Sequence, residues 1–441
     1  MVFILRHMNL FSRVVINFIV WFLSLNVGAQ SVNPVIDSLI GLISVDRYSG
    51  HFDSLMTGPH NNRKVIPGKQ QSADHDACRD YIFRQFQHHL GIENCYLHHF
   101  ETGIYGGLAN VIAFKEGTNR EAGIWVVSAH YDSNNSNERL PNKEHFSPGA
   151  NDNGTGVAAI LEMARIFSGI ETEASILFAA WDFEEQFTNG FPTGSNRWFT
   201  DKVSRKIGTE WDQIGSGGTI NIRELKGNIN FDMFGNPQME KEGKLLLWAC
   251  YASNQHIEFA ENYALTLNLY VPEFETATYG RLLLSDHYTF AARKIPALVN
   301  LESGYMNDPF YHTSADHHLN YQNINFVFAT QVTRGGLAFV LEQTQLAISK
   351  KDGIDQNIMV LHSFENQWAY FFEIPGQQPV VSIFNSQGQN MCTNITGNTL
   401  MFSPNANGLY YIQSIGNDGN VGKHLLLFQK ERPVFINGPF R

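Results

Sequence analysis

The chain has 441 residues, of which 43% are hydrophobic, and a formal net charge of −11 at neutral pH. This length is enough for two or three domains with a large core. The acidic balance argues against nucleic acid as a binding partner.

The first 29 residues have the pattern of a secretory signal peptide. Arg6 and Arg13 supply its positive region, a mostly apolar run covers residues 14–27, and residues 27–29 form a small-residue cleavage site. The alternative is a membrane anchor, but the apolar run is short for a bilayer span. We therefore expect an exported protein, periplasmic, at the cell surface or extracellular, with no membrane span after signal cleavage.

Apolar periodicity predicts an alternation of strands and helices after the signal. The expected helices are 76–90, 156–167 and 323–346, and the expected strands are 107–114, 124–128, 175–181, 228–234, 245–248 and 296–301. Continuous apolar strands that alternate with helices are typical of a parallel sheet covered on both faces. The sequence therefore predicts an α/β catalytic domain over residues 30–349, with a mostly parallel mixed sheet and helices on both faces.

The C-terminal part changes in character. Residues 350–357 are polar and contain glycine, which is typical of a linker. Residues 358–441 carry short aromatic and β-branched runs, and turn sequences at 385–388 and 417–420 separate them. We expect a small all-β sandwich there.

Four cysteines occur, namely Cys78, Cys95, Cys250 and Cys392. None has the CxxC spacing of a thiolate zinc site, and four are too few for a disulfide scaffold. Cys78 and Cys95 are candidates for a disulfide in an oxidising compartment, and two free buried thiols are the alternative.

Two motifs place potential metal ligands early in the predicted sheet. His130 follows the strand 124–128, and Asp132 is well placed to accept a hydrogen bond from its second ring nitrogen. Asp152 lies in the glycine-rich stretch 149–156 that opens a helix, where its carboxylate could bridge two cations or simply cap the helix. Alone, each motif is a weak signal.

Acids and a second histidine follow later strands. Glu184 and Glu185 come at the end of strand 175–181, where Glu185 can bind metal while Glu184 takes a proton from water. A solvated acidic loop is the alternative for this pair. Asp232 lies within an apolar strand, and a buried lone carboxylate is costly unless it pairs or binds a cation. His312 follows the strand 296–301.

The joint pattern is stronger than its parts. The five ligand candidates are His130, Asp152, Glu185, Asp232 and His312, and all fall at or next to predicted strand ends. In an open parallel sheet, ligands gather at the carboxyl ends of the strands. Two imidazoles and three carboxylates suit a pair of zinc ions.

The ordered motifs resemble those of the di-zinc aminopeptidases, a family that includes aminopeptidase Y, secreted bacterial leucyl aminopeptidases, glutamate carboxypeptidase and glutaminyl cyclase. The resembling stretches are 129–133, 149–156, 184–185, 230–235, 285–287 and 311–316, and together they cover roughly residues 100–345. The resemblance implies a zinc-exopeptidase fold, of the phosphorylase/hydrolase-like type.

The resemblance also implies roles for matching residues. Asp152 would bridge two Zn²⁺ ions. His130 and Asp232 would complete the ligands of one ion, and Glu185 and His312 those of the other. Glu184 would be the general base and later the proton donor. Asp132 would orient His130.

Two further motifs have alternative roles. Tyr311 stands where some members use a tyrosine hydroxyl to polarise the scissile carbonyl, and a packing aromatic is the alternative. The motif Ser285-Asp286-His287 is expected to be structural or to support a ligand, not to bind metal itself.

The predicted activity is hydrolysis of N-terminal bonds of peptide or protein substrates, by water that two zinc ions activate and with Glu184 as general base. One alternative is a glutaminyl cyclase, which forms N-terminal pyroglutamate and needs no attacking water. Another is a non-catalytic binding ectodomain, although such proteins typically lose ligands and none is lost here.

Two segments depart from the family pattern, and the C-terminal region resembles a different domain. Residues 186–195 are longer than the short Gly-Leu-x-Gly-Ser run usual in the family, which affects loop shape and side-chain preference. Residues 201–226 look like an extra loop or helix near the site. The stretches 381–389 and 403–412 are similar to the sorting domain of the type IX secretion pathway, which would make the secretion machinery a partner. A generic β-sandwich that binds substrate or stabilises the enzyme is the alternative.

Overall fold

The structure is a computed structural model that describes residues 32–137, 146–204, 214–317 and 324–347, and beyond these the backbone of strands between 358 and 436. The predicted signal peptide (1–29) and the predicted linker (350–357) lie outside the described residues. No helix in the described ranges is both long enough and apolar enough to cross a bilayer.

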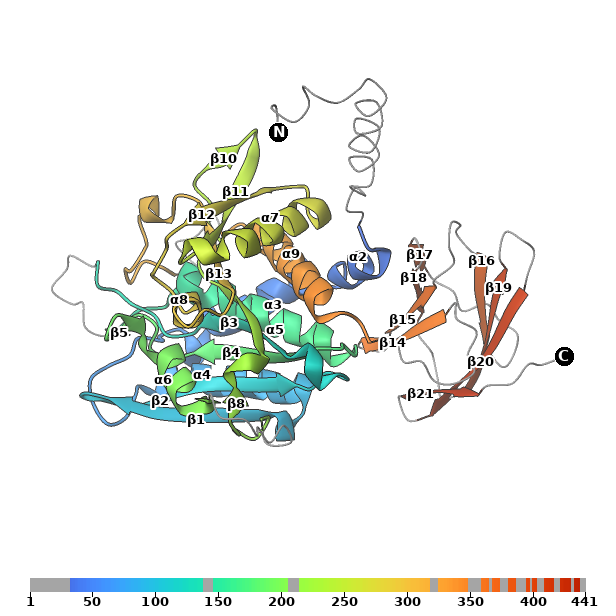
Figure 1. Ribbon diagram of the computed structural model, residues 1–441, viewed down its shortest axis with the longest axis horizontal. Coiled ribbons are helices and arrows are strands. Elements are labelled where there is room, and N and C mark those ends of the chain that lie inside the picture. Colours follow the sequence, from blue (N-terminus) through green and yellow to red (C-terminus); the bar gives the residue numbers. More distant parts are fainter. Residues whose placement is uncertain are drawn as a thin grey trace, which may run out of the picture. The chain divides into compact units, whose positions relative to one another are not determined.

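A nine-stranded sheet organises the described part of residues 34–347 (Figure 1). Its order is β1-β2-β4-β3-β9-β13-β11-β10, and β12 pairs with β11 as well. The strands are β1 Cys95–Thr102, β2 Tyr105–Lys115, β3 Ile124–His130, β4 Ser175–Trp181, β9 Leu225–Phe231, β10 Glu240–Lys241, β11 Lys244–Tyr251, β12 Glu275–Gly280 and β13 Ala297–Glu302.

The centre of the sheet is parallel and its flanks are mixed. Strands β4, β3, β9 and β13 pair in parallel. On one side β1 and β2 pair antiparallel to their neighbours, and on the other β11 runs antiparallel to β13. The parallel centre points its carboxyl ends toward one edge, which is where a ligand site is expected.

Helices cover both faces, as the sequence predicts. They are α2 Pro34–Ile40, α3 Val45–Met56, α4 Ala73–Leu90, α5 Thr155–Ser168, α6 Thr193–Lys202, α7 Ile257–Tyr270, α8 His287–Ala291 and α9 Phe326–Thr344. Because side chains alternate along a strand, Val127 and Phe178 join a core with α3, α4, α5, α7 and α9. Val126 and Leu177 join a second core with α6 and α8 on the other face.

Element boundaries follow local capping and backbone conformation. Strand β4 has the predicted bounds, whereas α4 begins three residues before the predicted start because the Ser72 hydroxyl accepts the His75 N–H at 3.1 Å. The predicted strand 228–234 is wrong at its end. β9 stops at Phe231, and Met233 takes a left-handed φ of 47°. Asp232 therefore lies just beyond the strand, not within it.

The described cysteines Cys78, Cys95 and Cys250 are buried and free. Of the two alternatives for Cys78 and Cys95, the structure therefore agrees with free buried thiols and not with a disulfide.

The backbone of the C-terminal region forms two four-stranded antiparallel sheets. One has the order β14-β15-β18-β17 and the other β16-β19-β20-β21. Their bounds are β14 Ile358–Phe364, β15 Gln367–Phe372, β16 Val380–Asn385, β17 Asn394–Thr396, β18 Thr399–Phe402, β19 Gly408–Ile415, β20 Val421–Gln429 and β21 Arg432–Ile436. This agrees with an all-β region, and the packing of the two sheets as a sandwich stays a prediction.

Candidate metal centre

The five predicted ligands gather at the carboxyl edge of the parallel strands. His130 is the last residue of β3, Asp232 follows β9, and Glu185 lies four residues beyond the end of β4. Asp152 comes from the short helical turn Ala150–Gly154 that leads into α5. His312 lies in the loop between β13 and α9.

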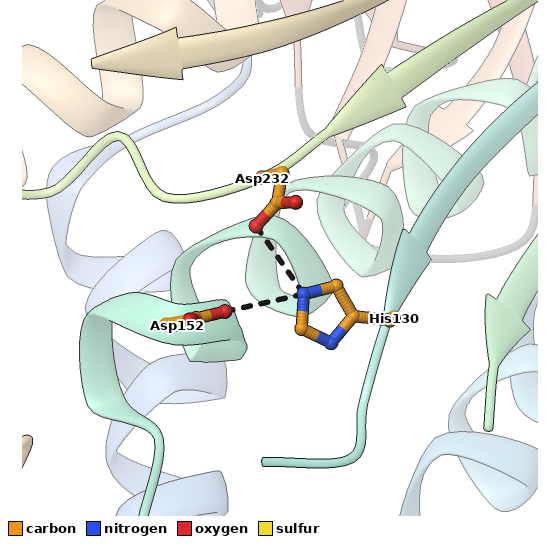
Figure 2. Close-up of side chains that lie close together, drawn as sticks. All are labelled: His130, Asp152 and Asp232. Atoms are coloured by element: carbon orange, nitrogen blue, oxygen red, sulfur yellow. Dashed lines mark hydrogen bonds and ion pairs between the residues drawn. The ribbon is translucent and has the colours of Figure 1, made fainter. Parts of the chain in front are cut away.

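One imidazole faces two carboxylates, as Figure 2 shows. The Nε2 atom of His130 lies 3.2 Å from Asp152 Oδ1 and 3.2 Å from Asp232 Oδ1. Its Nδ1 atom lies 3.2 Å from the main-chain carbonyl of Asp132. A carbonyl can only accept, so Nδ1 carries a hydrogen, and Nε2 is the ring nitrogen that a cation could bind in place of a proton.

The second imidazole faces the other side of the same aspartate. His312 Nε2 lies 3.1 Å from Asp152 Oδ2 and 3.0 Å from Glu185 Oε2. The two carboxylate oxygens of Asp152 thus point to two different histidines. Two three-residue groups with donor atoms within 4.8 Å of one another result, His130-Asp152-Asp232 and Asp152-Glu185-His312.

The electrostatics of this cluster call for bound cations. Although burial opposes protonation of His312, the Glu185 and Asp152 carboxylates raise its pKa to about 11. Burial raises the pKa of Glu185 to about 7. In addition, Glu185 Oε1 is buried and has no hydrogen-bond partner among the described residues. Cations that replaced the imidazole protons would neutralise the acids and give this oxygen a ligand, so the donor set fits zinc.

Glu184 lies beside the ligands in a third group of donor atoms, with His130 and Glu185. Its side chain is buried, and burial raises its pKa well above the ordinary value of a glutamate. Phe183 has a left-handed φ of 61°, which provides the sharp turn expected between β4 and the acid pair. This turn lets both acids reach one cluster from consecutive positions.

Asp132 has a broader role in the structure than orienting His130. Its carboxylate oxygen lies 3.5 Å from His130 Nδ1, longer than the contact from the main-chain carbonyl. The same carboxylate accepts the N–H of Glu184 at 3.0 Å and that of Glu185 at 3.2 Å. Asp132 therefore fixes the turn that carries both acids.

Tyr311 packs its ring against its neighbours. The ring stacks on His312 at a centroid distance of 3.9 Å and meets Tyr305 edge-on at 5.8 Å. These contacts support the packing alternative, and the role of its hydroxyl in catalysis stays a prediction.

Ser285 and Asn153 support the segments that carry candidate ligands. The sequence left the role of Ser285 open and assigned none to Asn153. The Ser285 hydroxyl donates to Asp232 Oδ2 at 2.7 Å, which places the Ser285-Asp286-His287 motif beside a ligand. The Asn153 amide donates to the carbonyl of Phe231 at 2.8 Å and so ties the Asp152 turn to β9. The glycine-rich stretch was the signal for Asn153, but nothing in its spacing indicates this partner.

The segment after the acid pair forms a short hairpin, β5 Phe187–Thr188 with β6 Phe191–Pro192. The Phe191 ring stacks on Tyr288 at 5.0 Å, and the Arg293 guanidinium lies over Phe191 at 5.2 Å. Of residues 201–226, the described part contains the end of α6 and the short pair β7 Val203–Ser204 with β8 Ile220–Asn221.

Comparison with known proteins shows which family the sequence matches. The sequence profile of "Peptidase family M28" matches residues 110–333, just over half of the chain. Aminopeptidase YwaD of Bacillus subtilis is 31% identical over 136 residues, 28% of this chain and 26% of that protein. A probable zinc metalloprotease of Pyricularia oryzae is 42% identical over 79 residues, 18% of this chain and 15% of that protein. The chain thus matches only about a quarter or less of these relatives' lengths.

Solved structures share the fold. The LapA aminopeptidase of Legionella pneumophila superposes with a TM-score of 0.54 at 19% identity, over 72% of this chain and 76% of that chain. The glutaminyl cyclase of Porphyromonas gingivalis superposes with a TM-score of 0.51 at 20% identity, over 68% of this chain and 99% of that chain. At these identities the likeness shows the fold alone. It agrees with the predicted α/β class.

Proposed function

Because the chain belongs to peptidase family M28, we propose that it is an exported two-zinc aminopeptidase that hydrolyses N-terminal peptide bonds. Membership of this family agrees with the metallopeptidase predicted from the sequence. The observation that carries this proposal is the position of Asp152, whose two oxygens lie 3.2 Å and 3.1 Å from the imidazoles of His130 and His312. A carboxylate shared in this way suits two neighbouring cations.

Each ligand has a defined place in the proposed site. His130, Asp152 and Asp232 would hold one zinc ion, and His312, Glu185 and the shared Asp152 the other. Zinc held by these residues would supply Lewis-acid chemistry, which lowers the pKa of a bound water and polarises the scissile carbonyl. The buried carboxylate group of Glu184 takes the proton from water and later gives it to the departing amine.

Burial is what equips Glu184 for both steps. Because burial raises its pKa, the side chain holds a proton more readily than an exposed glutamate does. The backbone N–H groups of Glu184 and Glu185 are fixed by Asp132, so the base and the ligand keep their separate positions. The Tyr311 hydroxyl is proposed to polarise the substrate carbonyl.

A substrate assay that separates release of an amino acid from release of ammonia tests the activity. We expect a peptide with an N-terminal leucine to yield free leucine, with activity lost on chelation and restored by Zn²⁺. Ammonia and a pyroglutamyl product from an N-terminal glutamine peptide, without release of free amino acids, would instead indicate the glutaminyl cyclase that shares this fold. No turnover of either substrate would favour a binding ectodomain.

We also propose that residues 1–29 direct export and that residues 358–441 take part in secretion sorting. The support is the signal-like N-terminal sequence and the sorting-like stretches at 381–389 and 403–412. Expression of the full chain, followed by N-terminal sequencing of the protein outside the cytoplasm, tests the first point. We expect the mature chain to begin at Gln30, and an intact Met1 on exported protein would contradict cleavage.

A further inference from the structure

Asp316 is a buried carboxylate in the loop that carries His312, four residues further along the chain. Its Oδ1 accepts the main-chain N–H of Asn151 at 2.8 Å, and its Oδ2 accepts that of Asp152 at 3.1 Å. Its main-chain carbonyl also accepts the N–H of Ala150 at 3.0 Å. One residue thus receives three consecutive N–H groups from the turn that presents Asp152.

This arrangement joins two segments that are distant in sequence. The turn at Asp152 opens α5, whereas His312 lies between β13 and α9. The three hydrogen bonds that Asp316 accepts hold the two segments together beside the 3.1 Å contact of His312 Nε2 with Asp152 Oδ2.

The other ligands are held by contacts that do not involve this loop. Asp232 receives the Ser285 hydroxyl at 2.7 Å, and Asn153 ties the Asp152 turn to the carbonyl of Phe231 at 2.8 Å. The N–H groups of the acid pair are held by Asp132. The contact between Asp152 and His130 therefore keeps these supports without Asp316. The His312 loop would keep the N–H of Asn137 on the His312 carbonyl at 2.9 Å and the 3.4 Å contact of the Asn151 amide with Asp308, but it would lose its three shorter hydrogen bonds to the Asp152 turn.

We propose that Asp316 is a positioning residue that sets the Asp152 turn and the His312 loop at the spacing needed for the second zinc ion. This inference rests on the two-zinc function proposed above. Its consequence is selective, because loss of Asp316 should weaken the ion held by His312 and Glu185 more than the ion held by His130 and Asp232.

Substitution Asp316→Asn changes the acceptors with little change in size. An amide offers one acceptor oxygen, and its NH₂ group would face a main-chain N–H, so one hydrogen bond is lost and two donors meet. Asp316→Ala, which removes both acceptors without adding a donor, is made in parallel so that misfolding of one variant does not decide the result. Thermal unfolding checks that each variant is folded.

The matched control is Glu302→Gln. Glu302 is also a buried carboxylate with two donors, the Asn151 side chain at 2.7 Å and the Asn236 N–H at 2.6 Å. Neither donor belongs to the His312 loop. The control therefore alters a buried carboxylate near the same turn and leaves in place the three hydrogen bonds that Asp316 accepts.

The experiment is a titration of chelator-treated full chain with zinc chloride by calorimetry, with metal counted by elemental analysis. Wild type should bind two ions. The Asp316 variants should keep one tightly bound ion and bind the second about 10- to 100-fold more weakly, as is typical when a residue that orients a ligand is lost. Glu302→Gln should not show this selective loss.

Three outcomes would overturn the assignment. They are two ions bound to the Asp316 variants with wild-type affinity, equal weakening of both ions, or the same selective loss in Glu302→Gln. Wild type that binds fewer than two zinc ions would instead contradict the two-zinc function itself, so the two failures are distinguishable.

Discussion

Three residues in or next to the site adopt backbone conformations that residues other than glycine rarely take. Phe183, Met233 and His312 have φ values of 61°, 47° and 54°. Each left-handed residue costs roughly 1 kcal/mol. Phe183 turns the chain just before Glu184, and Met233 does so just after Asp232. Hydrogen bonds at each turn help to offset this cost. Asp132 accepts the N–H groups of Glu184 and Glu185, the Met233 carbonyl accepts the N–H of Glu302 at 2.7 Å, and the His312 carbonyl accepts that of Asn137 at 2.9 Å.

Replacement of Tyr311 by phenylalanine tests the proposed role of its hydroxyl. We predict that kcat falls by about 100-fold with little change in KM, which is the typical effect of losing one oxyanion donor. The ring contacts with His312 and Tyr305 do not need the hydroxyl, so stability should stay at the wild-type level. Tyr305→Phe is the control, and equal kcat values for Tyr311→Phe and wild type would leave only the packing role.

Removal of the Ser285 hydroxyl tests the support of Asp232. Ser285→Ala deletes the donor that lies 2.7 Å from Asp232 Oδ2. We expect zinc affinity to fall by about 10-fold, at the lower end for residues that orient a ligand. A metal-competition assay with a chelator measures this, and unchanged affinity would show that β9 alone positions Asp232.

The clustering of the candidate ligands could be predicted from the sequence, but most of the contacts that position them could not. His130 and Glu185 follow apolar runs, and that pattern places them at or near strand ends, whereas His312 lies ten residues beyond the end of β13. The roles of Asn153 and Asp316 were not predicted, because each acts through main-chain N–H or carbonyl groups of distant segments. Such partners have no fixed spacing in the sequence, even where the residue itself lies in a recognisable motif.

At the scale of elements, a buried ion pair fastens α4 to the end of β4. His75 Nε2 lies 2.9 Å from Asp182 Oδ1, and both side chains are fully buried. Asp182 also accepts the N–H of Ala109 in β2 at 2.9 Å. The pair thus connects a helix with two strands, two residues before Glu184.

The pair predicts a dependence of stability on pH. Burial alone would lower the pKa of His75, but the Asp182 carboxylate raises it from 6.5 to about 9. The stabilisation is therefore complete below about pH 6.5 and is lost as the pH rises through about 9. Urea unfolding at pH 6.5 and pH 9.5 should show this loss in wild type.

His75→Gln provides the comparison for that measurement. We expect it to lower the free energy of unfolding at pH 6.5 by about 3 kcal/mol, because it leaves a buried carboxylate without its cation. Its own stability should change less between the two pH values. The same pH dependence in wild type and variant would rule out His75 as the titrating group.

A glycine fixes the approach of α5 to the end of β9. A Cβ atom on Gly156 would lie 2.4 Å from the carbonyl of Phe231 and 2.4 Å from Asn153 Oδ1. Gly156→Ala should therefore cost at least about 1–3 kcal/mol, since the backbone has to shift. Gly50→Ala in α3 meets nothing within 4 Å and should be neutral or stabilising. Equal melting temperatures for the two variants would contradict this packing.

The central elements were predicted more accurately than those at the margins of the sheet. Strand β4 is buried at every position, and its apolar run defines its bounds. Strand β12 has exposed residues over its last three positions, so it lacks a continuous apolar signal and was not predicted. The end of β9 was misplaced because Met233 and Phe234 extend the apolar run beyond the point where the backbone turns.

At the scale of the whole molecule, the parallel strands β4, β3, β9 and β13 explain why ligands distant in sequence meet. Their carboxyl ends lie along one edge, and four of the five ligands lie at or beyond those ends. The coarse fold class followed from alternating strands and helices. A mixed sheet was predicted, but which strands run antiparallel was not, because strand direction depends on connections that periodicity does not specify.

The central claim is that bound metal and Glu184 have separate tasks in one hydrolytic site. Glu184→Gln keeps the size of the side chain but removes its capacity to exchange a proton at neutral pH. Parallel measurement of zinc content and of amino-acid release from a leucine peptide separates the two tasks. We predict two zinc ions per chain in both proteins and a loss of activity of at least about 100-fold in the variant. Near wild-type activity in Glu184→Gln would contradict the account.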